Sequence, residues 1–159
     1  MSGLAGLAQV ALVGTVCALL VWAAASDLQR YVIPNRICLS LLALYPGYAT
    51  GLAPIDIGIS AAIAVCVFAA GAAFFAYGLM GGGDVKLLAA VSLWAGSAYF
   101  PAFLLLTTLA GGALAMGWNP LIRHFFPSIA EGRAGNGRPA IPYGVAIAVG
   151  GLFVAVNLY

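Results

Sequence analysis

The chain has 159 residues, of which 64% are hydrophobic and only 6% are charged. A soluble domain carries about 25% charged residues, so this composition excludes an ordinary water-soluble fold and predicts a protein whose solvent is lipid. The formal net charge of +2 comes without a stripe of basic residues, and we therefore expect no nucleic-acid partner.

Six apolar stretches follow one another along the chain, and we expect each to form a membrane helix. A span needs roughly 20 apolar residues, and lipid offers the backbone no hydrogen-bond partner outside the helix. The predicted fold is all-α, a polytopic membrane bundle of about six helices, with 1–159 forming a single integral-membrane domain. The expected segments are Leu4–Ala25, Ile37–Ala53, Ile55–Leu79, Val85–Phe100, Ala102–Trp118 and Ile141–Leu158.

Two connections in this division have distinctive sequences. The fourth segment is expected to stop before Pro101, because proline interrupts a helix. The fifth and sixth segments are joined by the longest polar stretch, Asn119–Ala140, which contains several glycines. We expect this stretch to be a loop.

The basic residues test the predicted order of the helices. All six fall in alternate connections, and the positive-inside rule places those connections in the cytoplasm. Both termini are then extracytoplasmic, whereas Asp27 and Asp84 face the cytoplasm and Asp56 lies on the opposite side. The basic residues are Arg30, Arg36, Lys86, Arg123, Arg133 and Arg138.

Metal and cofactor chemistry has little support in the sequence. The three cysteines are widely spaced and form no CxxC pair, and the single histidine, His124, is distant from them in the chain. Structural zinc requires four closely arranged ligands. We therefore expect neither a metal site nor a cofactor.

Two of the four acidic residues lie at the ends of apolar segments. Asp27 follows the first segment, and Asp84 follows three consecutive glycines at the start of the fourth. A carboxylate beside hydrocarbon is costly and is a candidate functional group. Two such groups on one side of a membrane can hydrolyse a peptide bond, because an ionised carboxylate takes a proton from water while a protonated one donates to the carbonyl oxygen.

Structural interpretations of the same residues remain open at this point. Asp84 could cap a helix, and Asp27 could cap a helix or pair with Arg30. Asn35 could cap a helix or hydrogen-bond a substrate. Lys86 could anchor the chain at the membrane surface or act electrostatically on Asp84.

Two other functional classes fit a small apolar bundle. Membrane-embedded carboxylates also mark ion pathways, so a small proton-coupled transporter or channel is an alternative to a protease. A non-catalytic membrane scaffold is a third hypothesis, since the many small residues favour close helix packing. The latter two predict no proteolysis.

Three motifs, in order along the chain, give the sequence a family resemblance. An aspartate is followed by Ile33-Pro34-Asn35, a GxGD motif occurs as Gly81-Gly82-Gly83-Asp84 and continues as Val85-Lys86-Leu87, and Pro142-Tyr143-Gly144 leads into the last segment. At these residues the chain resembles the type IV prepilin peptidases, which are intramembrane aspartyl proteases. The resemblance implies that Asp27 and Asp84 are the catalytic pair. It implies supporting or substrate-binding roles for Asn35, Gly81, Gly83, Lys86, Pro142, Tyr143 and Gly144.

The resemblance also implies a substrate and a location. Such enzymes remove the basic leader peptide of prepilins or pseudopilins at the cytoplasmic face of the bacterial inner membrane. Long members add a soluble N-terminal region with paired CxxC motifs and a methyltransferase activity, which we do not expect in this chain. The short form is similar to the peptidases of Flp (tight-adherence) pilus systems. No feature of the sequence specifies an oligomeric state.

Overall fold

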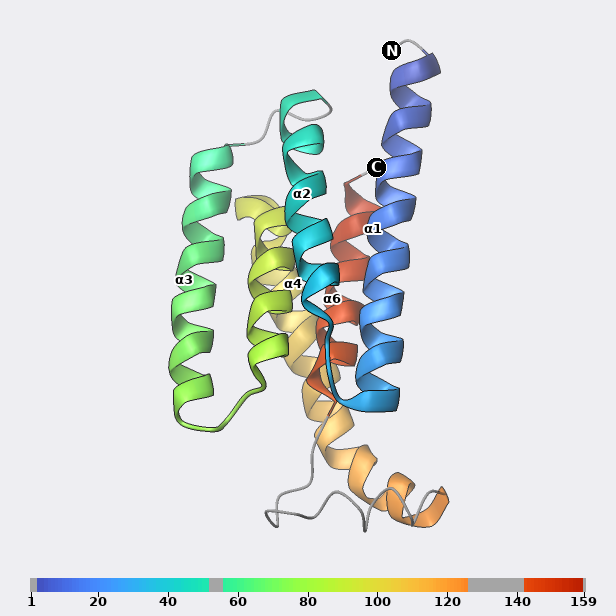
Figure 1. The fold of residues 1–159 in the computed structure, drawn as a ribbon, viewed down its shortest axis with the longest axis vertical. Helices are drawn as coiled ribbons and strands as arrows, with labels where there is room; N and C mark the ends of the chain where they lie inside the picture. Colours follow the sequence, from blue (N-terminus) through green and yellow to red (C-terminus); the bar gives the residue numbers. More distant parts are fainter. Residues whose placement is uncertain (1–2, 52–55, 126–141, 159) are drawn as a thin grey trace.

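The structure, a computed structural model, describes residues 3–51, 56–125 and 142–158, and these form five helices that run side by side (Figure 1). Their bounds are α1 (Gly3–Arg30), α2 (Asn35–Gly51), α3 (Ile57–Ala76), α4 (Gly82–Phe125) and α6 (Tyr143–Asn157). Three of the helices contain segments long and apolar enough to cross a membrane: Gly6–Arg30, Ile57–Ala76 and Gly82–Met116. The expectation of a helical membrane bundle is therefore confirmed.

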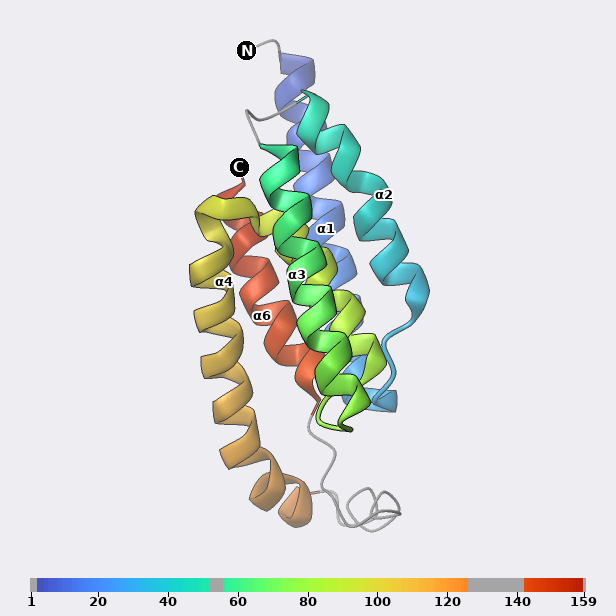
Figure 2. The ribbon, with the colours of Figure 1, turned by 90° about the vertical axis from the view of Figure 1, so that its left-hand side faces the viewer.

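Helix α4 consists of two helical segments that meet at Gly96, whose backbone angles are φ 54° and ψ −162°. Figure 2 shows the chain reversing direction there, so that the second segment descends beside the rest of the bundle. The expected interruption at Pro101 is wrong, since Pro101 lies within the second segment. Glycine reaches positive φ at little cost, whereas proline is fixed near −65°, and the reversal therefore falls at the glycine.

The two ends of the bundle contain different helix ends and connections. α1 begins and α6 ends near one end, while the connections 31–34 and 77–81 lie at the other, which is the lower end in Figure 1. Arg30, Arg36 and Lys86 adjoin these two lower connections, as the alternation of charge predicts. Within the expected loop Asn119–Ala140, the residues up to Phe125 continue α4, and the remainder, with Arg133 and Arg138, lies outside the described residues.

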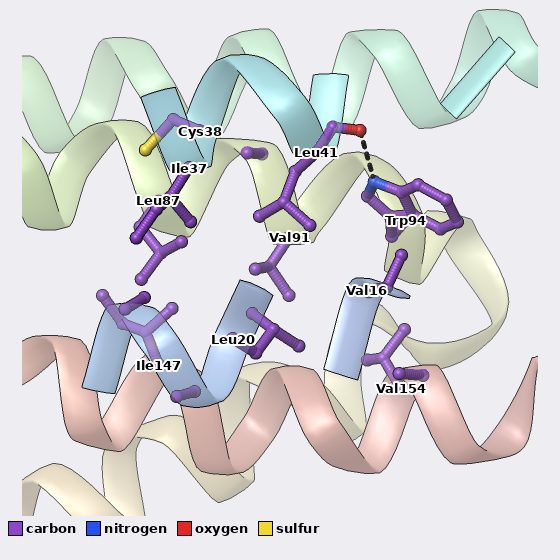
Figure 3. Close-up of a cluster of buried hydrophobic side chains, with 14 of the residues drawn as sticks. Val16, Leu20, Ile37, Cys38, Leu41, Leu87, Val91, Trp94, Ile147 and Val154 are labelled. Carbon is purple, nitrogen blue, oxygen red and sulfur yellow. Dashed lines mark hydrogen bonds between the residues drawn. The ribbon is translucent and has the colours of Figure 1, made fainter. Parts of the chain in front are cut away.

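Four of the helices share one hydrophobic core (Figure 3). Leu20 of α1, Leu41 of α2, Val91 of α4 and Val154 of α6 are almost completely buried in it. The indole Nε1 of Trp94 donates a hydrogen bond of 3.0 Å to the backbone oxygen of Leu41, which fixes α2 against α4. This core packs α1, α2, α4 and α6 against one another over much of their length.

Helix α3 is attached differently. It contributes nothing to that core, and its buried residues are Ser60 and Gly71. A Cβ atom at Gly71 would lie 2.8 Å from a methyl carbon of Val85, so the two backbones approach closely through a small residue, as is common between membrane helices. Most other side chains of α3 are exposed, including Val65 and Phe68.

Candidate active site

Asp27 lies one turn before the end of α1 and is only 4% exposed. Its Oδ2 accepts a hydrogen bond of 2.7 Å from the backbone N–H of Gly144, and the N–H of Val145 also donates to this carboxylate. These donors belong to the first turn of α6, whose own N-cap residue, Pro142, makes no side-chain cap bond. Asp27 therefore caps a helix, as one interpretation of the sequence allowed, but that helix is α6, 117 residues away along the chain.

The position of Asp27 depends on the absence of a side chain at Gly144. A Cβ atom there would lie 2.8 Å from Asp27 Oδ2 and 2.8 Å from Ile33 Cδ1. Such distances are far inside ordinary van der Waals contact, so any larger residue must displace the carboxylate, the isoleucine or both.

The connection between α1 and α2, residues 31–34, packs against the start of α4 and the start of α6. α1 ends where the N–H of Tyr31, at φ 52°, donates to the backbone oxygen of Asp27 at 2.8 Å. The Ser26 hydroxyl donates to the Val32 oxygen at 2.7 Å. Ile33 is then buried between Gly144 and Gly83, with its Cβ 3.2 Å from where a Cβ of Gly83 would be. Ile33 thus fixes the distance between the start of α6 and the start of α4.

Asp84 lies in the first turn of α4, two residues after the helix begins. The preceding helix, α3, is closed by paired bonds from Gly78 and Leu79 to the backbone oxygens of Phe75 and Phe74, an arrangement typical of helix C-termini. The chain then turns through Gly81, whose N–H donates to the Asp84 carboxylate. A Cβ at Gly81 would lie 2.8 Å from Asp84 Oδ2, so this glycine allows the carboxylate to fold back over the helix start.

The two carboxylates line the same cleft, which has a volume of about 370 Å³ and includes residues of both lower connections. Its walls are the end of α1, the connection 31–34 and the start of α4, and we call it the aspartate cleft. The third described acidic residue, Asp56, lies at the other end, where it accepts from the N–H of Ile59 and caps α3. A cleft with two carboxylates and room for water has the groups that general acid–base hydrolysis requires.

The predicted supporting residues lie in several parts of the structure. Asn35, Gly81 and Gly83 line the aspartate cleft. Lys86 donates to Asn35 Oδ1 at 2.9 Å, so the Asn35 side-chain oxygen binds a lysine instead of taking the helix-cap role favoured by its sequence position. Pro142 is buried at the start of α6, and Tyr143 faces Gly111 of α4.

Two positioning residues were not among the predicted site residues. Ile33 belongs to the Ile33-Pro34-Asn35 motif, which predicted no role for it, and no local pattern predicted a role for Ser26. Both act through contacts between segments distant in sequence or across a chain reversal, which the local pattern does not reveal. The available signal for Ile33 was its position, directly before Pro34 and shortly after the helix end that contains Asp27.

Comparison with known families gave a match over more than half of the chain. A model of the type IV leader peptidase family matches residues 14–116. The chain belongs to this family. The match to the type IV leader peptidase model includes both candidate aspartates, while α6, which binds Asp27, lies beyond it. No curated protein and no solved structure matched the chain.

Gly81→Ala should separate activity from stability. The new Cβ would meet only the end of the Asp84 side chain, which can rotate away without disturbing the helices. We expect the thermal stability of the detergent-purified protein to change little while the cleavage rate falls by about 10- to 100-fold, because the carboxylate leaves its position. An unchanged rate would show that the placement of Asp84 against Gly81 is irrelevant to activity.

Proposed function

We propose that this member of the type IV leader peptidase family is an intramembrane aspartic endopeptidase whose catalytic groups are Asp27 and Asp84. One observation carries the proposal: the two carboxylates line one cleft although they are 57 residues apart in the sequence. Each is placed by backbone N–H donors and by glycines that leave it space. Structural capping alone accounts for the N–H bonds of Asp27 but gives no reason for a second carboxylate in the same cleft.

The chemistry requires only the two carboxylates and water. The ionised carboxylate removes a proton from a water molecule, whose oxygen attacks the carbonyl carbon of the scissile amide. The protonated carboxylate donates to the carbonyl oxygen, and collapse of the tetrahedral intermediate breaks the C–N bond as the amine leaves protonated. Two neighbouring carboxylates favour this division because they share one proton more readily than they both ionise.

The proposed substrate is the basic leader peptide of a prepilin or pseudopilin of the Flp type. The lower end of the bundle, where Arg30, Arg36 and Lys86 adjoin the connections, is then the cytoplasmic end by the positive-inside rule. In this arrangement the segments on either side of Gly96 act as separate spans, six helices cross the bacterial inner membrane, and both termini are extracytoplasmic. The cleft receives the leader from the cytoplasm.

The direct test is to reconstitute the purified protein in liposomes with a candidate Flp-type prepilin and locate the cut by mass spectrometry. We expect a single cut at the end of the basic leader. Intact prepilin after prolonged incubation, with solute flux that depends on Asp84, would instead favour a transporter.

The pH dependence follows from the shared proton. At low pH both carboxylates are protonated and no base remains, whereas at high pH both are ionised and no acid remains. We expect a bell-shaped profile of kcat/KM for prepilin cleavage. A rate that continues to rise into strongly alkaline solution would contradict the mechanism.

A further inference from the structure

α1 and α3 both end at the lower end of the bundle in Figure 1, but different residues follow them. The connection after α3 contains Gly78, at φ 68°, whereas the connection after α1 begins with Tyr31, at φ 52°. Glycine adopts positive φ at little cost, but in a residue with a side chain this conformation brings Cβ close to the following carbonyl oxygen. Tyr31 is the only non-glycine residue with positive φ in the described part of the chain. A strained tyrosine thus occupies a position for which glycine is better suited.

Contacts on both sides of Tyr31 hold its backbone in this conformation. The N–H of Tyr31 donates to the backbone oxygen of Asp27 at 2.8 Å, and the Ser26 hydroxyl donates to the Val32 oxygen at 2.7 Å. Ile33, two residues further on, is buried. A sparsely populated conformation persists where its surroundings enforce it, and such residues are concentrated at active sites. None of these contacts uses the Tyr31 side chain, so glycine or asparagine would follow the same backbone path with less strain.

The location of Tyr31 supplies a reason for the tyrosine. Tyr31 is half-buried, and it is not among the described residues that form or border the shared hydrophobic core. It lines the aspartate cleft together with Asp27 and Asp84, whereas Gly78 is not among the described lining residues. The strained residue therefore occurs in the connection that forms a wall of the cleft beside Asp27, and glycine occurs where the chain turns away from the cleft. This difference favours a role for Tyr31 inside the cleft over a role in ending α1.

We propose that Tyr31 is a substrate-binding residue, whose side chain contacts the peptide beside the scissile bond and holds that bond in front of the two carboxylates. This inference rests on the proposed function and adds a recognition group to the same cleft. A tyrosine ring offers an apolar face that packs against a peptide, and its hydroxyl can donate to or accept from a backbone amide. Tyrosine is also common at membrane–water interfaces, and a second tyrosine at the same end of the bundle separates the two roles.

Tyr31→Asn and Tyr77→Asn form a matched pair of variants. Asparagine tolerates positive φ, so Tyr31→Asn removes the ring and the hydroxyl without adding strain. Tyr77 ends α3 at φ −82°, is 78% exposed and is not among the described residues that line the cleft. We expect Tyr31→Asn to raise KM for a prepilin in liposomes by about ten-fold or more, the size of effect expected for a lost aromatic contact, and to leave kcat within about two-fold. Its thermal stability should equal or exceed that of the wild-type protein, and Tyr77→Asn should change neither kinetic constant.

Two results would overturn the inference while the proposed function stands. The first is an unchanged KM for Tyr31→Asn. The second is a lower thermal stability together with a lower kcat, which would assign Tyr31 to the fold instead of to the substrate. A wild-type protein that leaves the prepilin intact would remove the proposed function and this inference with it.

Photocrosslinking tests the contact without relying on kinetics. Benzoylphenylalanine in place of Tyr31, combined with Asp84→Asn so that the prepilin stays intact, should form an adduct with the prepilin close to its cut site. The same photoreactive residue in place of Tyr77 should form none with the prepilin. Adducts with lipid alone at position 31 would contradict the inference, because they would identify Tyr31 as a membrane anchor.

Discussion

Asp27→Asn and Asp84→Asn should each lower prepilin cleavage by about 10³-fold or more, within the range expected for loss of a general acid or base. An amide neither accepts a proton from water nor donates one to the carbonyl oxygen as an acid. Asparagine keeps the shape of aspartate and a carbonyl oxygen that can accept from the Gly144 N–H, 2.7 Å from Asp27 Oδ2. Both variants should therefore fold and insert normally.

Asp56→Asn is the matched control for this pair. Asp56 caps α3 at the opposite end of the bundle, and asparagine is an equally good N-cap residue. The measurement is the ratio of processed to unprocessed prepilin on immunoblots of cells that co-express each variant, together with its amount in the membrane. Normal processing by either cleft variant, or equal loss in all three, would remove the proposed catalytic roles.

Gly144→Ala should have the second largest effect. The added methyl group would lie 2.8 Å from both Asp27 Oδ2 and Ile33 Cδ1, and packed surroundings accept such an insertion only at a cost of about 1–3 kcal/mol. Relief requires movement of the carboxylate or of the connection 31–34. We expect kcat/KM for prepilin cleavage to fall about 10²-fold, the loss typical of a misplaced catalytic group.

Two further variants separate a local effect from general disruption. Gly14→Ala adds the same group in α1, where nothing lies within 4 Å of the new atom, and should leave activity and stability intact. Ile33→Val removes Cδ1, one of the two clashing atoms, and should partly restore the activity of Gly144→Ala. Absence of any coupling between positions 33 and 144 in this double-mutant cycle would show that Ile33 does not transmit the effect.

Composition and charge were sufficient for the class of fold. The apolar segments predicted a helical membrane bundle, and the family motifs led to the type IV leader peptidases, a family that the match over residues 14–116 shows. The chain reversal was predicted at Pro101 but occurs at Gly96. Both residue types interrupt helices, and a positive φ, which selects glycine, becomes visible only in the folded backbone.

The sequence motifs indicated the residues of the candidate site but not how those residues contact one another. The motifs indicated Asp27, Asp84 and Gly144, but not that the Gly144 N–H binds Asp27 or that Ile33 lies between two glycines. These contacts join α1, α4 and α6, and their specificity comes from packing across the bundle. The spacing of residues along the chain does not reveal partners on other helices. The capping interpretation of Asn35 was wrong for this reason, because its partner Lys86 is 51 residues away.

Cleavage in water enriched in oxygen-18, compared between the wild-type protein and its two aspartate variants, tests most directly whether the cut is a hydrolysis that requires both carboxylates. The purified protein and its Asp27→Asn and Asp84→Asn variants are incubated with the same prepilin, and the released leader is weighed by mass spectrometry. The account predicts one cut by the wild-type protein, one oxygen-18 atom in the new carboxylate of the leader, and no product from either variant. Product from either variant, or a leader without the heavy oxygen, would contradict it.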